Sequence, residues 1–187
     1  SDSVRHEIDG AFSEVQSVLT LFRNVMRIGE IESGRCVHQF EDFCAQQLLH
    51  DLAEYYQPLA EEHQCTLVVD LSAGIQLFGD RALVFQAMAN LIENALKYAA
   101  GTGRIMLGVQ LYRGWLALVV ADLGPGIAPE HYPAAPERFE RLGQDTTHSG
   151  FGLGLSLVRA IAELHNGKLS FGSAEPGLVG YLCRHRS

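Results

Sequence analysis

The sequence has no long apolar run and few positive charges. None of its segments reaches the ~20 apolar residues of a transmembrane helix, and no signal peptide is visible at its start, so the sequence predicts no membrane span. Its 14 Lys and Arg residues are outnumbered by 22 Asp and Glu residues, and the formal net charge is −8 at pH 7. Such a surface repels the phosphates of nucleic acids and of anionic lipids. We therefore expect no nucleic acid partner and no direct membrane contact.

Cysteine is also scarce. None of the four cysteines forms a CxxC pair, and no His stands beside them at zinc-ligand spacing; they are Cys36, Cys44, Cys65 and Cys183. This argues against a disulfide framework and a structural zinc site, and it predicts reduced thiols in a cytoplasmic protein. Hydrophobic residues make up 47% and charged residues 19% of the chain, which is an ordinary globular composition. The 187 residues suffice for one core, or for one domain with an appendage.

The first 34 residues carry a heptad pattern. Between Val4 and Glu32, rows of apolar side chains that include Val15 and Phe22 recur every seven residues, and Gly34 follows as a helix stop. The pattern predicts one long helix of a bundle or coiled coil. Its apolar stripe has no partner within the segment, so we expect it to pack on a second chain or on a helix outside this sequence. The start inside a helical pattern, without an initiator Met, indicates a fragment of a longer protein.

After Gly34, strands and helices follow one another without the regular βαβ alternation of a parallel sheet, which predicts an α+β domain. Asp80 is expected to cap a helix. The stretch from Asp122 to Gly150 is rich in Pro, Gly and polar residues, and its length is typical of a functional lid. The expected elements are a strand at 36–40, a helix at 41–62, a strand at 66–71, a helix at 80–98, a hairpin of 104–112 and 115–121 around 113–114, a helix at 153–165, and strands at 168–172 and 178–183.

The first motif that indicates chemistry is Asn90-Leu-Ile-Glu93-Asn94-Ala-Leu-Lys97-Tyr98. On a helix, Asn90, Asn94 and Lys97 share one face because they stand at i, i+4 and i+7. Two carboxamides and an ammonium group suit a metal-bound polyphosphate, since amide oxygens can ligate Mg²⁺. A solvated helix face with chance polar spacing is the alternative for this motif alone.

Two glycine motifs follow. Asp122-Leu-Gly124-Pro-Gly126 comes directly after an apolar strand, where a carboxylate can accept the exocyclic amine of adenine, although a plain turn leaving a strand is equally typical. Gly150-Phe-Gly152-Leu-Gly154-Leu155 opens a helix, where exposed N–H groups can bind phosphate oxygens. Each of these motifs alone is weak evidence.

Together and in this order, the three motifs resemble the N box and the glycine boxes of sensor histidine kinases, which belong with the gyrase, Hsp90 and MutL ATPases. Glu137-Arg-Phe139-Glu-Arg141 resembles the intervening F box, and the segment 28–34 resembles the end of the second dimerisation helix. The resemblance implies the Bergerat fold, a mixed and mainly antiparallel sheet with helices on one face, preceded here by the long helix. It also implies a partial dimerisation domain at 1–34 and an ATP-binding catalytic domain at 35–187.

The resemblance implies ATP and Mg²⁺ as cofactors. Asn90 and Asn94 would hold the metal, and Asn90, Glu93 and Lys97 would form the catalytic set. Asp122 would bind adenine, and Phe139 would anchor the lid. The residues expected to contact the nucleotide are Asn90, Asn94, Lys97, Tyr98, Asp122, Gly124, Gly126, Ile127, Phe139, Gly150, Gly152, Leu153, Gly154 and Leu155.

The activity implied is transfer of the ATP γ-phosphoryl group to a histidine on a helix missing here, for relay to a response regulator receiver domain, within a homodimer formed through the N-terminal helix. Asn90 stands where the hydrolytic relatives carry a Glu base, and an amide cannot take a proton, which disfavours hydrolysis. His6-Glu7 matches only the dipeptide of the phosphoacceptor motif, so we expect His6 to be a bundle-edge residue. A degenerate kinase that binds nucleotide and signals through dimer contacts is the alternative.

Overall fold

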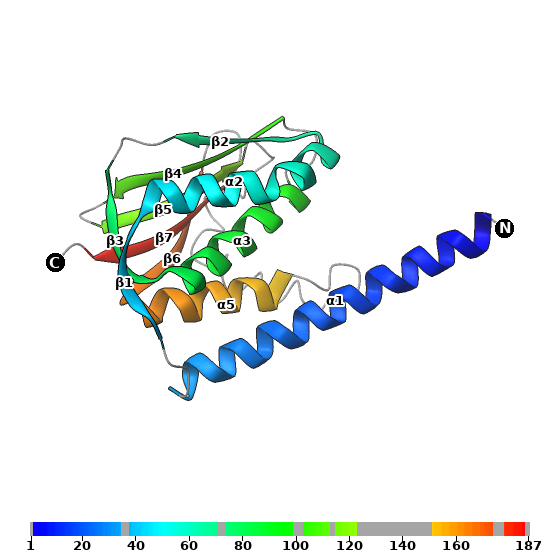
Figure 1. The fold of residues 1–187 in the computed structure, drawn as a ribbon, viewed down its shortest axis with the longest axis horizontal. Helices are drawn as coiled ribbons and strands as arrows, with labels where there is room; N and C mark the ends of the chain where they lie inside the picture. The colour runs from blue at the N-terminus through cyan, green and yellow to red at the C-terminus, as the bar shows by residue number, and fades with distance from the viewer. Residues whose placement is uncertain are drawn as a thin grey trace.

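The computed structural model describes residues 2–34, 38–70, 74–98, 103–112, 115–122, 151–173 and 178–185. A sheet is covered on one face by helices, and a long helix extends from this body to the N-terminus (Figure 1). The helices are α1 (Asp2–Glu32), α2 (Ala45–Glu62), α3 (Arg81–Tyr98) and α5 (Phe151–Leu164). The strands are β1 (Phe40–Cys44), β2 (Thr66–Asp70), β3 (Gln76–Asp80), β4 (Arg104–Tyr112), β5 (Trp115–Asp122), β6 (Gly167–Ser173) and β7 (Leu178–His185).

The main sheet has the strand order β2-β4-β5-β7-β6. Only β2 and β4 pair in parallel, and the remaining pairs are antiparallel. β4 and β5 form the expected hairpin, in which Ile105 stands opposite Asp122 and Tyr112 opposite Trp115. The α+β fold with a mixed, mainly antiparallel sheet and a long N-terminal helix is therefore confirmed. The hairpin also makes β5 the central strand, and its last residue is Asp122.

The core lies between the sheet and the helices α2, α3 and α5. Each helix turns an apolar stripe inward, because its apolar residues recur at three- and four-residue spacing. Leu48 and Leu52 of α2, Met88 of α3, and Leu157 and Ile161 of α5 are completely buried. Each such side chain contributes roughly 1.5–3 kcal/mol through burial, so the three helices are firmly attached to the sheet.

A second, two-stranded sheet was not expected from the sequence. β1 and β3 pair antiparallel, with Phe40 opposite Asp80 and Cys44 opposite Gln76. The expected bounds of the strand at 36–40 and the expected helix start at residue 41 are wrong, because the strand begins at Phe40 and the helix at Ala45; the expected helix end at Glu62 is confirmed. Residues 41–44 fit a helical pattern locally, but β3 gives their backbone groups partners across the sheet, and this long-range pairing overrides local preference.

α1 has two different faces. Its heptad stripe is exposed, with Val15 57% and Phe22 63% accessible. Its C-terminal half runs beside α5 (Figure 1), where Asn24 and Ile31 are buried. The helix ends as expected before Gly34, which has a positive φ of 64°. None of the described helices is long and apolar enough to cross a membrane.

The two cysteines whose side chains are described, Cys44 and Cys65, are free thiols. The expected reduced state of the cysteines stays a prediction. Cys36 and the side chain of Cys183 lie outside what the structure describes.

Candidate functional site

The N-box residues Asn90, Asn94 and Lys97 lie in the C-terminal half of α3. The helix begins as expected at a cap, since the Leu83 N–H donates to Asp80 Oδ1 at 3.1 Å. Asn90 is half-buried, and its Nδ2 donates to the Gln86 carbonyl at 3.0 Å, which leaves Oδ1 for another partner. Asn94 is also half-buried, and its Nδ2 is a buried donor without a hydrogen-bond partner in the described part of the chain. Such a donor is costly unless a ligand satisfies it.

The last glycine of the third motif lies directly against Asn90. A Cβ placed on Gly154 would be 3.1 Å from Asn90 Oδ1, closer than ordinary van der Waals contact. The N box on α3 and the glycine box on α5 therefore meet, although about sixty positions separate them in the sequence. α5 begins at Phe151, two residues before the expected start, so Gly152, Leu153 and Gly154 lie in its first turn. Helix N-termini carry N–H groups without intrahelical partners, which suit phosphate.

Leu155 was expected among the residues that contact the nucleotide. It lies within α5 and belongs to the core, with 6% of its surface accessible.

Asp122 is the last residue of the central strand β5, and only 7% of its surface is accessible. A buried carboxylate is costly unless other groups compensate its charge, and Asp122 does interact with other parts of the chain. α3 packs on β5, so Asp122 lies in the sheet layer beneath the N-box helix. This is the layer in which an adenine acceptor is expected.

Glu93 is attached to α2. Its Oε1 accepts a hydrogen bond from the Tyr56 hydroxyl at 2.7 Å. Burial raises the pKa of the Tyr56 phenol above its ordinary value, and the hydrogen bond and charge of Glu93 raise it further. Tyr56 therefore stays a neutral donor, and Glu93 faces α2 while Asn90 faces α5.

The remaining site residues are less completely described. Lys97 is exposed in the last turn of α3, where it interacts with another group of the chain, and Tyr98 is the last residue of that helix. Gly124, Gly126, Ile127, Phe139 and Gly150 lie outside the described residues, together with the expected lid.

The donor set fits a metal that is shared with phosphates. Within the described ranges, no group of three His, Cys, Asp or Glu side chains could hold a metal ion. Mg²⁺ usually takes only one or two protein oxygens and completes its shell with phosphate and water. Asn90 Oδ1, which lies against Gly154, is such an oxygen. The unsatisfied Nδ2 of Asn94 is a donor and suits a phosphate oxygen instead.

Sequence reasoning missed two residues near the other end of α3. His165 was expected only as a helix-end residue, but it is buried and its Nε2 accepts the Asp80 N–H at 3.0 Å. Gly79 was not singled out, although a Cβ there would be 2.5 Å from the His165 ring. Nothing in the local sequence pairs residues this far apart.

Comparison with known proteins agrees with the motifs. The family model described as "Histidine kinase-, DNA gyrase B-, and HSP90-like ATPase" matches residues 79–181, more than half of the chain. The adaptive-response sensory kinase SasA of Crocosphaera subtropica is 36% identical over 136 residues, which cover 71% of this chain and 35% of SasA. The sensor histidine kinase RppB of Synechocystis sp. is 29% identical over 157 residues, which cover 82% of this chain and 35% of RppB. The chain thus spans about a third of the length of these curated relatives.

Solved structures share the fold. Full-length ShkA in complex with AMPPNP has a TM-score of 0.74 and 23% identity, over 92% of this chain and 36% of ShkA. The mycobacterial sensor histidine kinase MprB has a TM-score of 0.61 and 26% identity, over 76% of this chain and 95% of the MprB chain.

Proposed function

This chain belongs to the family of histidine kinase-, DNA gyrase B- and HSP90-like ATPases, as the ATP-binding catalytic domain of a two-component sensor histidine kinase, and we propose that it holds ATP together with Mg²⁺ at the meeting point of α3 and α5. One observation carries the location of the site: Gly154 brings the start of α5 to within 3.1 Å, measured from its would-be Cβ, of the Asn90 amide oxygen. No side chain other than hydrogen fits there while Asn90 keeps its place.

The amides of α3 would bind the metal and the phosphates. Asn90 Nδ2 is already bonded to Gln86, so its oxygen is the atom that can serve as a metal ligand. The buried N–H of Asn94 would donate to a phosphate oxygen, which supplies the missing partner. When bound, Mg²⁺ would neutralise part of the phosphate charge. Lys97 would add a positive charge near the same phosphates.

The adenine would bind over the end of β5. The Asp122 carboxylate can accept the exocyclic amine, and its burial favours that pairing over bulk solvent. We propose that Tyr98, Gly124, Gly126 and Ile127 complete this end of the site. The lid with Phe139, together with Gly150 and with Gly152 and Leu153 in the first turn of α5, would enclose the phosphates. Leu155 would act behind them from the core.

The proposed reaction is phosphoryl transfer to a histidine. The bond between the γ-phosphorus and its bridging oxygen breaks, a phosphorus–nitrogen bond to the imidazole forms, and ADP leaves. Catalysis of this kind consists mostly of positioning and charge neutralisation. Asn90 cannot accept a proton from water, which disfavours hydrolysis. The catalytic role expected of Glu93 stays a prediction. Its Oε1 accepts a hydrogen bond from the Tyr56 hydroxyl.

Partners follow from the same family membership. We propose that the exposed stripe of α1 pairs with a second copy of the chain, because a row of side chains such as Val15 and Phe22 exposes a long apolar surface in the monomer. The receiver domain of a response regulator would take the phosphoryl group from the histidine. The division into a partial dimerisation domain at 1–34 and a catalytic domain at 35–187, and a cytoplasmic location, remain part of this proposal.

Titration calorimetry with ATP, in Mg²⁺ and in EDTA, tests the site. Asn94→Ala should weaken Mg-ATP binding about tenfold, since it removes a buried donor that only the ligand satisfies. Gln47→Ala is the matched control, because it removes an amide from the exposed side of α2, where Gln47 donates a hydrogen bond to Asp51. Equal Mg-ATP affinity of Asn94→Ala and the unmodified chain would refute the placement of the phosphates.

A further inference from the structure

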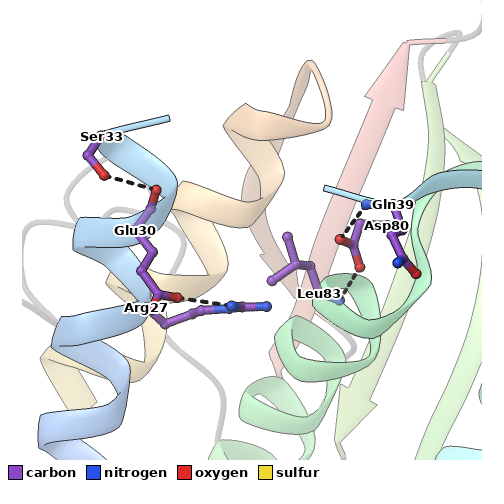
Figure 2. Close-up of polar contacts among 6 residues, drawn as sticks. All are labelled: Arg27, Glu30, Ser33, Gln39, Asp80 and Leu83. Atoms are coloured by element: carbon purple, nitrogen blue, oxygen red, sulfur yellow. Dashed lines mark hydrogen bonds and ion pairs between the residues drawn. The ribbon is translucent and has the colours of Figure 1, made fainter. Parts of the chain in front are cut away.

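Asp80 joins three parts of the chain at the far end of α3. Its Oδ1 accepts the Leu83 N–H at 3.1 Å, and its Oδ2 accepts the Gln39 N–H, from the segment before β1, at 3.3 Å. Figure 2 shows the carboxylate between these two donors. The backbone N–H of Asp80 donates to His165 Nε2 at 3.0 Å. Asp80 is only 8% accessible, and its contacts with Leu83 and His165 are buried, whereas the contact with Gln39 is partly buried.

His165 follows the last turn of α5 and can act here only as an acceptor at Nε2. Its other nitrogen, Nδ1, lies 2.7 Å from the Ile161 carbonyl oxygen. A carbonyl oxygen only accepts, so Nδ1 carries the proton. The ring is therefore the neutral tautomer, in which Nε2 is the acceptor.

Gly79 makes the approach of this ring possible. A Cβ at Gly79 would lie 2.5 Å from His165 Cδ2 and 2.8 Å from Nε2, so any side chain there displaces the imidazole. The Phe40 ring covers another side, with its centroid 5.0 Å away. Residues of β1, β3 and α5 therefore hold the imidazole in a defined position.

Two contacts lie at the two ends of α5: one joins the residue after α5 to the last residue of β3, directly before α3, and the other joins the first turn of α5 to the middle of α3. Asp80 meets His165 at one end, and Asn90 meets Gly154 at the other. Ten positions separate Asp80 from Asn90, and eleven separate Gly154 from His165. At 1.5 Å per helical residue these are matched spans of roughly 15 and 16 Å. Because a helix is stiff along its axis, a shift of α5 at His165 must also appear at Gly154.

We infer that Asp80 and His165 are positioning residues that set the axial register of α5 on α3, and thereby the place of Gly154 against the Asn90 oxygen. The inference rests on the proposed metal role of Asn90. Without the imidazole acceptor, the Asp80 N–H is buried without a partner in this register, and shifted registers gain population. Mg-ATP then binds only the fraction of molecules that has the correct register.

A conservative substitution separates positioning from general stability. His165→Leu should raise the Kd of Mg-ATP about tenfold, whereas the Kd measured in EDTA changes little, because the adenine end at β5 does not depend on Asn90. The oxygen of Gln can accept the same N–H, so His165→Gln should stay within about threefold of the unmodified chain. Leu67→Ala is the stability control, because it opens a cavity under the edge strand β2, away from both contacts. All proteins are assayed at a temperature at which circular dichroism shows them folded.

A double-mutant cycle tests whether Gly79 and His165 act through the same position of the imidazole. Gly79→Ala should weaken Mg-ATP binding about as much as His165→Ala, because both remove the imidazole from Asp80. The double variant should be no worse than either single one, since the added methyl no longer meets a ring.

Additive losses in the cycle, or equal effects of His165→Leu and Leu67→Ala, would overturn the inference while the proposed function stands. An unmodified chain whose ATP affinity is the same with and without Mg²⁺ would refute the proposed metal role, and the inference with it.

Discussion

The contact between Gly154 and Asn90 predicts a variant that separates stability from ligand binding. Gly154 lies in α5, and its backbone is compatible with alanine because its φ is not in the positive range. Replacing glycine by alanine within a helix usually stabilises a protein by about 0.5–1 kcal/mol. Gly154→Ala should therefore unfold at the same temperature as the unmodified chain or slightly above it.

The same substitution should damage the metal site. The new Cβ would lie 3.1 Å from Asn90 Oδ1, and ordinary contact begins at 3.4 Å, so the amide oxygen must retreat by a few tenths of an ångström. Mg²⁺ demands near-ideal geometry with oxygen ligands at about 2.0–2.1 Å, so it tolerates such a displacement poorly. We expect the Kd of Mg-ATP to rise about tenfold, which corresponds to the loss of one charge-assisted contact.

Calorimetry with and without Mg²⁺, beside a thermal melt, measures both effects on one sample. Gly29→Ala is the matched control, because it adds the same methyl to a helix where nothing lies within 4 Å. It should share any gain in stability and leave Mg-ATP binding unchanged. Gly154→Ala with unaltered Mg-ATP affinity would show that Asn90 does not ligate the metal. A large loss of stability would show that α5 cannot take a side chain there at all.

Three further predictions concern other parts of the chain. The folded state raises the pKa of the Tyr56 phenol, so the stability that this group contributes is complete below pH ~10 and is lost as the pH rises above it. In urea titrations above pH ~10, the free energy of unfolding should fall by about 1.4 kcal/mol per pH unit more than that of Tyr56→Phe. Parallel curves for the two proteins would contradict this. Light scattering should show a dimer that becomes monomeric when Val15 and Phe22 are both changed to Asp; a monomer in the unmodified chain at high concentration would refute the stripe as an interface. Incubation with γ-labelled ATP should leave the chain essentially unlabelled, and strong labelling that disappears in His6→Ala would make His6 the acceptor.

The sequence predicted those elements whose signals are local. The heptad of α1, the cap of α3 at Asp80 and the β4–β5 hairpin depend on periodicity, a capping side chain and a short turn, all of which act over a few residues. The sheet formed by β1 and β3 could not be predicted, because neither strand shows the alternation of a half-buried strand. Each exists through the other, about thirty-five positions away in the chain, and only the folded arrangement brings them together.

The candidate site divides in the same way. Spacing placed Asn90 and Asn94 on one helix face, and the family resemblance added Gly154. The structure adds that Gly154 lies against Asn90. The partner of Glu93 could not be predicted, because Tyr56 belongs to α2 and looks like an ordinary core aromatic in the sequence. The contact between His165 and Gly79 could not be predicted either, since a glycine in a strand and a histidine after a helix are both common without any special role.

These contacts explain how one helix can present its amides in a fixed geometry without a metal cluster of its own. α3 is fixed at its N-terminus by Asp80 and His165, along one side by Glu93 and Tyr56 of α2, and along another by Asn90 and the start of α5. His165, Tyr56 and the start of α5 are all distant from α3 in the sequence, so a change in any of them can alter the site without touching the nucleotide. The segment before β1 reaches the same helix through the Gln39 N–H. A displacement of the chain that leaves α1 would therefore act on Asp80, which contacts both α3 and His165. Affinity for Mg-ATP should respond to it more strongly than affinity for ATP in EDTA.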